Sequence, residues 1–449
     1  MDNAGRWPLA RKRHQPRTAC GPPDPRRPAI TLWDHRVTRC RADDHSGGTM
    51  TERILLDPRT PDLRAQAEQL RRCGPVAPAE WPGGVHCWAV VGHAELETVL
   101  TDPRFARSPT HWRALRDGEI AADWPMLAHL RRTWMLTADG ADHRRLRHAV
   151  AAAFTPRRVE GLTPAITATV EALLDDLEAA AQDGPVDLRA AYALPLPLNT
   201  LCALFGIPPG DRPEVAALVG RALSRAALTP EESAALTREI NTCLADLVRS
   251  RSAAPGDDLV TDLLRGGTDG DGGLSEVELL DMLWLFLGAG FETTAGALVN
   301  TAHALLVHPR ELDRALGGRV GWDAVVEEGI RYDSSVYALP FAYPTEDLEL
   351  GGRALRAGDA LLLCFAAANR DPRHGEVRFE TGRAGARPRQ LGFGQGPHFC
   401  VGAPLARLQL RIALARLFER FPGLRLAGPP GPPVPSLIAS TPSALYVSR

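Results

Sequence analysis

The segment 391–404, LGFGQGPHFCVGAP, constrains the fold of this chain more than any other. Its glycines, among them Gly394 and Gly396, let the backbone turn tightly beside Cys400 and approach a flat ligand closely. From Pro404 onward, apolar residues recur at helical spacing, and a proline in the first turn of a helix costs no hydrogen bond. The sequence therefore predicts that Cys400 lies at a helix N-terminus, where the helix dipole and free N–H groups favour a metal-ligating thiolate.

A long apolar stretch, residues 274–307, predicts a single helix that starts with a capping box formed by Ser275 and Glu278. Its middle reads GAGFETT, residues 288–294. Each of the two glycines costs roughly 1 kcal/mol relative to alanine, but together they let another group pack against the helix backbone. An acid followed by two threonines is unusual on an apolar helix. This pattern indicates a functional site on the helix, or alternatively a helix kink with a hydrogen-bonded buried Glu292.

Two shorter motifs place charged groups on one face of a helix. His143 and Arg147 lie four residues apart, and Glu328 and Arg331 lie three apart. Taken alone, each pattern is typical of a solvated helix surface, where such pairs contribute little. Their position relative to the two segments above indicates instead that they belong to the same pattern as those segments.

Taken together, these motifs resemble the cytochrome P450 family. The segment around Cys400 matches that family's haem-binding signature, F-G-x-G-x-H-x-C-x-G, at every fixed position. The GAGFETT segment matches its oxygen-binding helix, [AG]-G-x-[DE]-T-[TS]. The resemblance covers about residues 50–449 and implies a mainly α chain with the cytochrome P450 fold, a triangular helix-rich prism with small antiparallel β-sheets.

The resemblance also implies a role for each matching residue. Cys400 would ligate the iron of heme b, Thr293 would hydrogen-bond bound dioxygen, and Glu292 would relay protons. Glu328 and Arg331 would form a buried structural pair joined by a third arginine, either Arg378 or Arg383. His143, Arg147 and His398 would bind the propionates of the cofactor. Ala289 and Gly290 would make room for oxygen, and Phe393 and Gly402 would also contact the cofactor.

One position departs from the family pattern. The strand after Tyr332 normally carries an arginine that binds a haem propionate, and alignment on the residues 345–347 puts Ala342 in its place. No basic residue occurs between Arg331 and Arg353. We therefore expect that one propionate lacks a bidentate partner, with consequences for haem retention or reduction potential.

The chain divides into a basic extension and one domain. Residues 1–49 are rich in Arg and Pro and carry a net charge of +5, which predicts a disordered extension. Residues 50–449 show no composition shift, which predicts a single domain, and the resemblance implies that this is a cytochrome P450 domain. The net charge of −2 argues against nucleic-acid binding. The first 49 residues lack the apolar core of a signal peptide, and the eight cysteines show no zinc-binding spacing. We therefore expect a cytoplasmic monomer that does not enter the membrane.

The implied activity is that of a haem-thiolate monooxygenase that inserts one oxygen atom of O2 into a lipophilic small molecule of secondary metabolism, macrolide- or steroid-like. The chain has no flavin or iron–sulfur motif, so electrons would come from ferredoxin and an NAD(P)H-dependent ferredoxin reductase. We expect docking near Arg144, Arg145, Arg407 and Arg411. The alternatives are a non-catalytic haem-binding accessory protein and a peroxide-driven oxygenase, and the Glu292–Thr293 pair argues against both.

Overall fold

The computed structural model of the chain describes residues 53–449, except 125, 152–153, 224–229, 267–272 and 383–388. The chain separates into two units, Met1–Arg53 and Ile54–Arg449, and only the second is described below. The predicted extension, residues 1–49, lies outside the described residues, as does Arg383.

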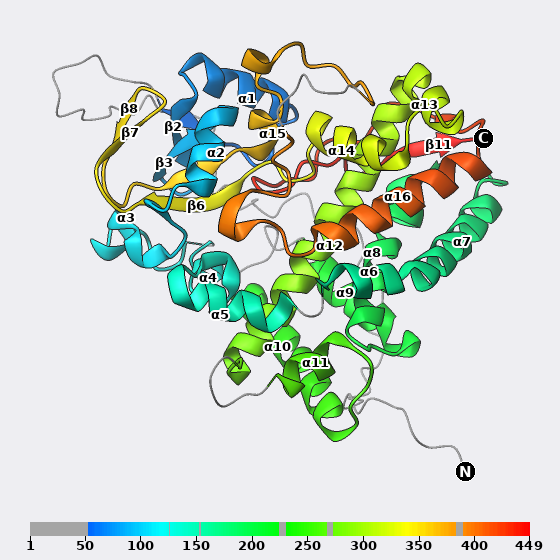
Figure 1. The fold of residues 1–449 in the computed structure, drawn as a ribbon, viewed down its shortest axis with the longest axis horizontal. Helices are drawn as coiled ribbons and strands as arrows, with labels where there is room; N and C mark the ends of the chain where they lie inside the picture. Colours follow the sequence, from blue (N-terminus) through cyan, green and yellow to red (C-terminus); the bar gives the residue numbers. More distant parts are fainter. Residues whose placement is uncertain (1–52, 125, 152–153, 224–229, 267–272, 383–388) are drawn as a thin grey trace, which may run out of the picture. The chain divides into compact units, whose positions relative to one another are not determined.

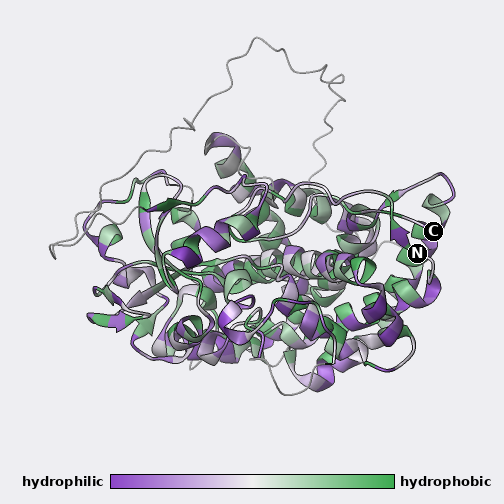
Figure 2. Ribbon diagram, turned by 90° about the horizontal axis from the view of Figure 1, so that it is seen from above, coloured by the Kyte–Doolittle hydropathy of each residue, from purple (hydrophilic) through white to green (hydrophobic). Residues whose placement is uncertain are grey.

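Helices dominate the unit Ile54–Arg449 (Figure 1), as the sequence predicts. The longer ones are α1 (Leu63–Arg72), α2 (His93–Thr101), α5 (Gly140–Ala151), α7 (Thr163–Ala180), α8 (Pro195–Leu204), α9 (Arg212–Leu223), α10 (Pro230–Ala253), α12 (Glu276–Val307), α14 (Trp322–Tyr332) and α16 (Ala403–Arg420). Shorter ones are α3 (Arg113–Arg116), α4 (Leu127–Leu130), α6 (Pro156–Gly161), α11 (Leu259–Arg265), α13 (Pro309–Leu316) and α15 (Phe365–Ala368). Single turns include η1 (Pro109–His111), η4 (Arg189–Ala193), η7 (Pro372–His374) and η8 (Gly396–His398). In Figure 2 most helices alternate between hydrophilic and hydrophobic residues, as helices with one buried face do.

The strands form small sheets. The largest has the order β1 (Ile54–Leu55), β2 (Val76–Trp81), β3 (Val85–Val90), β9 (Leu361–Leu363), β6 (Leu339–Pro344) and β4 (Phe105–Ala106). The others pair β10 (Arg425–Leu426), β11 (Tyr446–Ser448) and β5 (Val186–Asp187), and β7 (Leu348–Leu350) with β8 (Arg353–Leu355). Small sheets were predicted, but two pairings, β1–β2 and β3–β9, are parallel, because the chain reaches the second strand of each pair through a long crossover.

The helix α12 is the apolar centre of the described unit and packs against α8, α14 and α16. The predicted capping box is confirmed, since Ser275 and Glu278 satisfy each other's backbone N–H groups at its start. By length and composition, α12 is the one helix among the described residues that could cross a membrane, yet 72% of its apolar window is buried inside the protein. Burial of this kind is typical of a core helix.

Alternate residues of β6 face two different apolar cores. Phe341 and Tyr343 pack into one core together with Trp112. Ala342 faces the other core, where it meets Phe105 of β4 and Leu391 at the start of the cysteine loop. This second face of the sheet therefore lies next to the loop that carries Cys400.

The helix α14 holds the predicted buried ion pair. Two guanidinium nitrogens of Arg331 lie 2.7 Å from the two carboxylate oxygens of Glu328. Arg331 also donates to the carbonyls of Asn369 and Arg378, while Glu328 accepts from the N–H of Glu380. Arg378, one of the two candidates for the third arginine, thus contributes its backbone carbonyl to the cluster.

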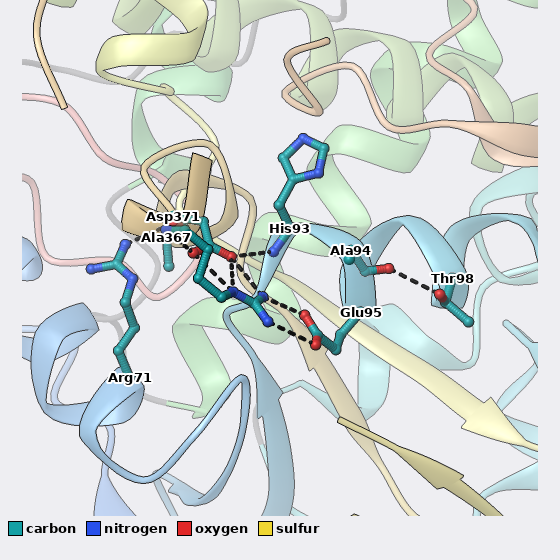
Figure 3. A network of polar contacts seen from close by, with 8 residues as sticks. Arg71, His93, Ala94, Glu95, Thr98, Ala367 and Asp371 are labelled. Carbon is teal, nitrogen blue, oxygen red and sulfur yellow. Dashed lines mark hydrogen bonds and ion pairs between the residues drawn. The ribbon is translucent and has the colours of Figure 1, made fainter. Parts of the chain in front are cut away.

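A polar network ties α2 to the segment that precedes the cysteine loop (Figure 3). The carboxylate of Asp371 accepts a hydrogen bond of 2.9 Å from the backbone N–H of His93, and Arg373 bridges Asp371 to Glu95. Burial opposes ionisation of Asp371, but the hydrogen bonds from Arg373 and the His93 N–H lower its pKa to about 2. The ring of His93 in turn contacts the carbonyl of Arg389 at 3.1 Å.

We predict that Glu328→Ala destabilises the protein by about 3–5 kcal/mol, because it leaves the Arg331 charge buried without its carboxylate. The matched control is Glu239→Ala, which removes one partner of an exposed pair with Arg221 and costs less than about 1 kcal/mol. Urea unfolding followed by circular dichroism measures both. Equal losses would show that the buried pair carries no special weight.

We also predict that Gly396→Ala destabilises the protein more than Gly394→Ala. Both glycines have a positive φ, +70° and +71°, so both substitutions introduce backbone strain of about 1–2 kcal/mol. A Cβ at Gly396 would also overlap the carbonyl oxygen of Leu100 in α2, whereas one at Gly394 would lie 3.7 Å from its nearest neighbour, the carbonyl of His398. Thermal unfolding compares the two variants, and equal melting temperatures would contradict the close approach of α2.

Candidate functional site

Cys400 lies between η8 and α16, as the sequence predicts. Its N–H donates to the carbonyl of Phe393 at 2.8 Å, and the backbone N–H groups of Gly402 and Ala403 point at its sulfur. Burial raises the pKa of the thiol more than these two N–H groups lower it. The helix N-terminus alone therefore does not generate the thiolate, and a coordinated metal, which deprotonates a thiol outright, would.

Cys400 combines accessible surface with strong desolvation by the surrounding protein atoms. Both observations hold when the accessible surface faces the interior of the protein rather than bulk solvent. In the described residues, no group of three or more His, Cys, Asp or Glu side chains is arranged to hold a metal.

Phe393 is fixed beside this loop by a cation–π contact. The guanidinium of Arg407, on α16, lies 4.4 Å from the centre of the Phe393 ring and 2.5 Å from a carboxylate oxygen of Glu327 on α14. The phenyl ring therefore connects the cysteine loop to two helices.

The GAGFETT segment forms an exposed patch in an otherwise buried helix. Ala289 is exposed and Thr293 is half-buried, whereas α12 is buried on both sides of them. The hydroxyl of Thr293 donates to the carbonyl of Ala289 at 2.5 Å, and the Thr293 carbonyl accepts from Ser335 at 2.7 Å. A Cβ at Gly290 would lie 3.2 Å from Leu201, so this glycine makes room for α8. Its predicted contact with the cofactor remains a prediction.

Glu292 is buried and paired with Arg189, a residue that the sequence analysis did not identify. One carboxylate oxygen lies 2.5 Å from the Arg189 guanidinium, and the other has no hydrogen-bond partner among the described residues. Burial raises the pKa of Glu292, although the Arg189 charge opposes that shift. The only signal in the sequence was a lone arginine at the start of the apolar run 188–205, and the long separation from Glu292 hid the pairing.

The predicted propionate ligands gather at one place. The rings of His143, on α5, and His398, in η8, lie 4.1 Å apart, and Nε2 of His143 is buried with no hydrogen-bond partner among the described residues. Burial lowers the pKa of both, and that of His398 falls to about 2, with further lowering by Arg147 and Arg107. Both imidazoles are therefore neutral donors, and the two arginines carry the positive charge. Arg107 was absent from the sequence-based set.

These residues fit an iron porphyrin. Cys400 would supply one sulfur ligand, as in haem-thiolate proteins. The cluster of His143, Arg147 and His398 would supply donors for carboxylates, and the Nε2 of His143, which is buried without a partner among the described residues, is one nitrogen that a propionate would satisfy. Ala289 exposes only a methyl group on α12, where a larger side chain would occupy the space.

The chain is similar to known proteins over most of its length. Residues 235–434 match the family model Cytochrome P450. The chain is 39% identical over 374 residues to the 2-hydroxy-5-methyl-1-naphthoate 7-hydroxylase of Streptomyces carzinostaticus, covering 83% of this chain and 91% of that protein. It is 36% identical over 397 residues to the cytochrome P450 monooxygenase PikC of Streptomyces venezuelae, covering 86% and 88%.

A solved structure is similar in fold as well as in sequence. The structure of CYP154A1 from Streptomyces coelicolor A3(2) superposes with a TM-score of 0.81 at 38% identity, and the match covers 88% of this chain and 99% of the other. Together with the cysteine loop, the buried Glu328–Arg331 pair and the GAGFETT helix, these similarities identify the chain. It belongs to the cytochrome P450 family, whose members carry a haem iron, and is a bacterial-type monooxygenase and thus an oxidoreductase.

Proposed function

We propose that this protein inserts one atom of O2 into a lipophilic small molecule of secondary metabolism, macrolide- or steroid-like, at a haem held by Cys400. The observation that carries this proposal is the patch on α12, where an exposed Ala289 and an accessible Thr293 adjoin the buried acid Glu292. A protein that merely bound haem would need no proton donor there. Relatives include a naphthoate hydroxylase and a 6-deoxyerythronolide B hydroxylase, which supports the substrate class.

In this proposal, two residues of α12, Glu292 and Thr293, transfer protons to the site. When bound, the haem iron with its thiolate ligand supplies dioxygen activation, because the thiolate donates electron density that favours O–O cleavage. Burial raises the pKa of Glu292, which favours proton uptake at the carboxylate oxygen that Arg189 leaves free. The hydroxyl of Thr293 then exchanges its bond to the Ala289 carbonyl for one to a bound ligand, and passes the proton on.

Access for the substrate is supported by a groove of about 860 Å³. Its lining combines apolar side chains such as Leu115 and Leu130 with charged ones, and its volume is in the range of sites for drug-sized ligands. The lining comes largely from residues 108–139. We propose that this groove is an entrance to the site.

Electrons would arrive from ferredoxin and an NAD(P)H-dependent ferredoxin reductase. Of the four arginines expected at the docking face, Arg145 pairs with Glu278 at 2.5 Å and Arg407 pairs with Glu327. Their charges are largely neutralised within the chain. Arg144 and Arg411 are exposed, and the partner of Arg411 at 3.5 Å is the highly exposed Asp323, so we assign the docking to these two arginines. A cytoplasmic, monomeric enzyme is part of the same proposal.

The first test is the carbon monoxide difference spectrum of the reduced protein. Wild-type protein should show the strongly red-shifted Soret band of a thiolate-ligated haem, and Cys400→Ser should lose it. Cys73→Ser, which changes a half-buried cysteine outside the loop, should keep it. A band at the ordinary position in wild-type protein would refute thiolate ligation and favour the non-catalytic accessory protein.

The second test concerns proton delivery. Thr293→Val should lower the product formed per NAD(P)H consumed by about tenfold or more and release peroxide instead, because the hydroxyl that passes the proton is lost. Thr294→Val is the matched control, since Thr294 is the buried neighbour. Turnover with ferredoxin, reductase and NAD(P)H, beside turnover with peroxide alone, gives the ratio. Full coupling in Thr293→Val would contradict the assignment, and efficient peroxide-only turnover would favour the peroxide-driven oxygenase.

A further inference from the structure

The family's propionate-binding arginine is replaced by Ala342, which is completely buried in β6. The strand next to β6 at the sheet edge is β4, which pairs with it in antiparallel register as Phe105↔Pro344 and Ala106↔Tyr343. Continuing this register by one residue places Arg107 directly opposite Ala342. Residues opposite each other on antiparallel strands project from the same face of the sheet.

That face is the one toward the cysteine loop. Ala342 and Phe105 both pack into the core that contains Leu391, the first residue of the loop segment. Arg107 is two residues after Phe105, and strand alternation therefore directs its side chain to the same side. The groove described above is lined by Ser108 and Asp139 but not by Arg107, which fits a side chain turned away from the outer surface.

The guanidinium of Arg107 has no protein partner of its own. Within the described ranges, no carboxylate forms an ion pair with it. Both carboxylate oxygens of the nearby Asp139 accept hydrogen bonds of 2.7–2.9 Å from the backbone N–H groups of Arg107 and Ser108. Burial nevertheless lowers the pKa of Arg107 to about 10, because protein atoms surround it. Arg107 is half-buried, and a partly desolvated cation without a carboxylate beside it favours an anionic partner.

Arg107 lies within the group of propionate ligands. Asp139 links Arg107 to this group, since its backbone carbonyl accepts from the N–H of His143 at 3.1 Å while its carboxylate accepts from the N–H of Arg107. The ring of His143 in turn lies 4.1 Å from that of His398. The group then contains two arginines, Arg107 and Arg147, for two propionates.

We infer that Arg107 binds the haem propionate that Ala342 leaves without an arginine, so that the missing guanidinium is supplied from the neighbouring strand. The inference rests on haem binding at Cys400, and it differs from the expectation that the Ala342 position leaves one propionate without a bidentate partner. Arg107 is a cofactor-binding residue and takes no part in the oxygen chemistry.

The experiment uses the haem-loaded protein and measures the rate at which haem transfers to excess apomyoglobin, together with the reduction potential of the iron. Arg107→Gln should transfer haem about tenfold faster or more, because a hydrogen bond to a charged group is lost. It should also shift the potential to more negative values, because a positive charge near the iron is removed. Arg107→Lys should lie between the two proteins. Arg104→Gln, at an exposed position three residues earlier, should behave as wild type.

The double variant Arg107→Ala/Ala342→Arg tests the inference from the other side, because it returns the guanidinium to β6. Its haem transfer should be slower than that of Arg107→Ala alone and should approach the wild-type rate. If Arg107→Gln yields no folded protein, the comparison of Arg107→Lys with this double variant decides the question. A double variant that loses haem as fast as Arg107→Ala would refute the exchange between strands.

Two results distinguish the inference from the function on which it rests. Absence of the thiolate spectrum in wild-type protein would refute haem ligation by Cys400 itself. A normal spectrum with unchanged haem transfer and potential in Arg107→Gln, but weaker binding of a carboxylate substrate such as a naphthoate, would refute only the propionate assignment. Arg107 would then recognise the substrate.

Discussion

The desolvation of charged groups around Cys400 is the constraint on which the rest of the structure depends. Burial raises the pKa of the thiol, desolvates Arg107 and keeps His143 and His398 neutral. These groups are costly to bury without a ligand that carries both a metal and carboxylates. The surrounding helices therefore serve to hold a prosthetic group, and the stability of the protein and its cofactor affinity are linked through the same residues.

The scaffold isolates this site by rigid local contacts. The loop is held from one side by α2, whose Leu100 carbonyl lies where a side chain at position 396 would be, and from the other by α14 and α16 through Arg407. The Glu328–Arg331 pair and the Asp371 network each fix the chain around residue 369, just ahead of the loop. Such support positions reactive groups to a fraction of an ångström, which catalysis requires.

The oxygen side of the site combines two opposite demands. In the proposed function, Glu292 takes up a proton, which burial favours, while the adjacent Arg189 stabilises the carboxylate when it is ionised. Thr293 would contact a bound ligand, and its bond to the Ala289 carbonyl orients the hydroxyl. One helix satisfies both demands, because consecutive residues of α12 face different neighbours.

The sequence by itself determined the cysteine loop, the capping box and central motif of α12, the Glu328–Arg331 pair and the identity of the family. These features are local, since spacing along one helix or loop decides them. Only the tertiary structure brought Arg189 to Glu292 and the strand β4 beside β6, because partners separated by more than a hundred residues leave no periodic signal. It likewise decided that burial outweighs the helix N-terminus at Cys400 and that Gly290 makes room for α8, since desolvation and close packing depend on which elements meet.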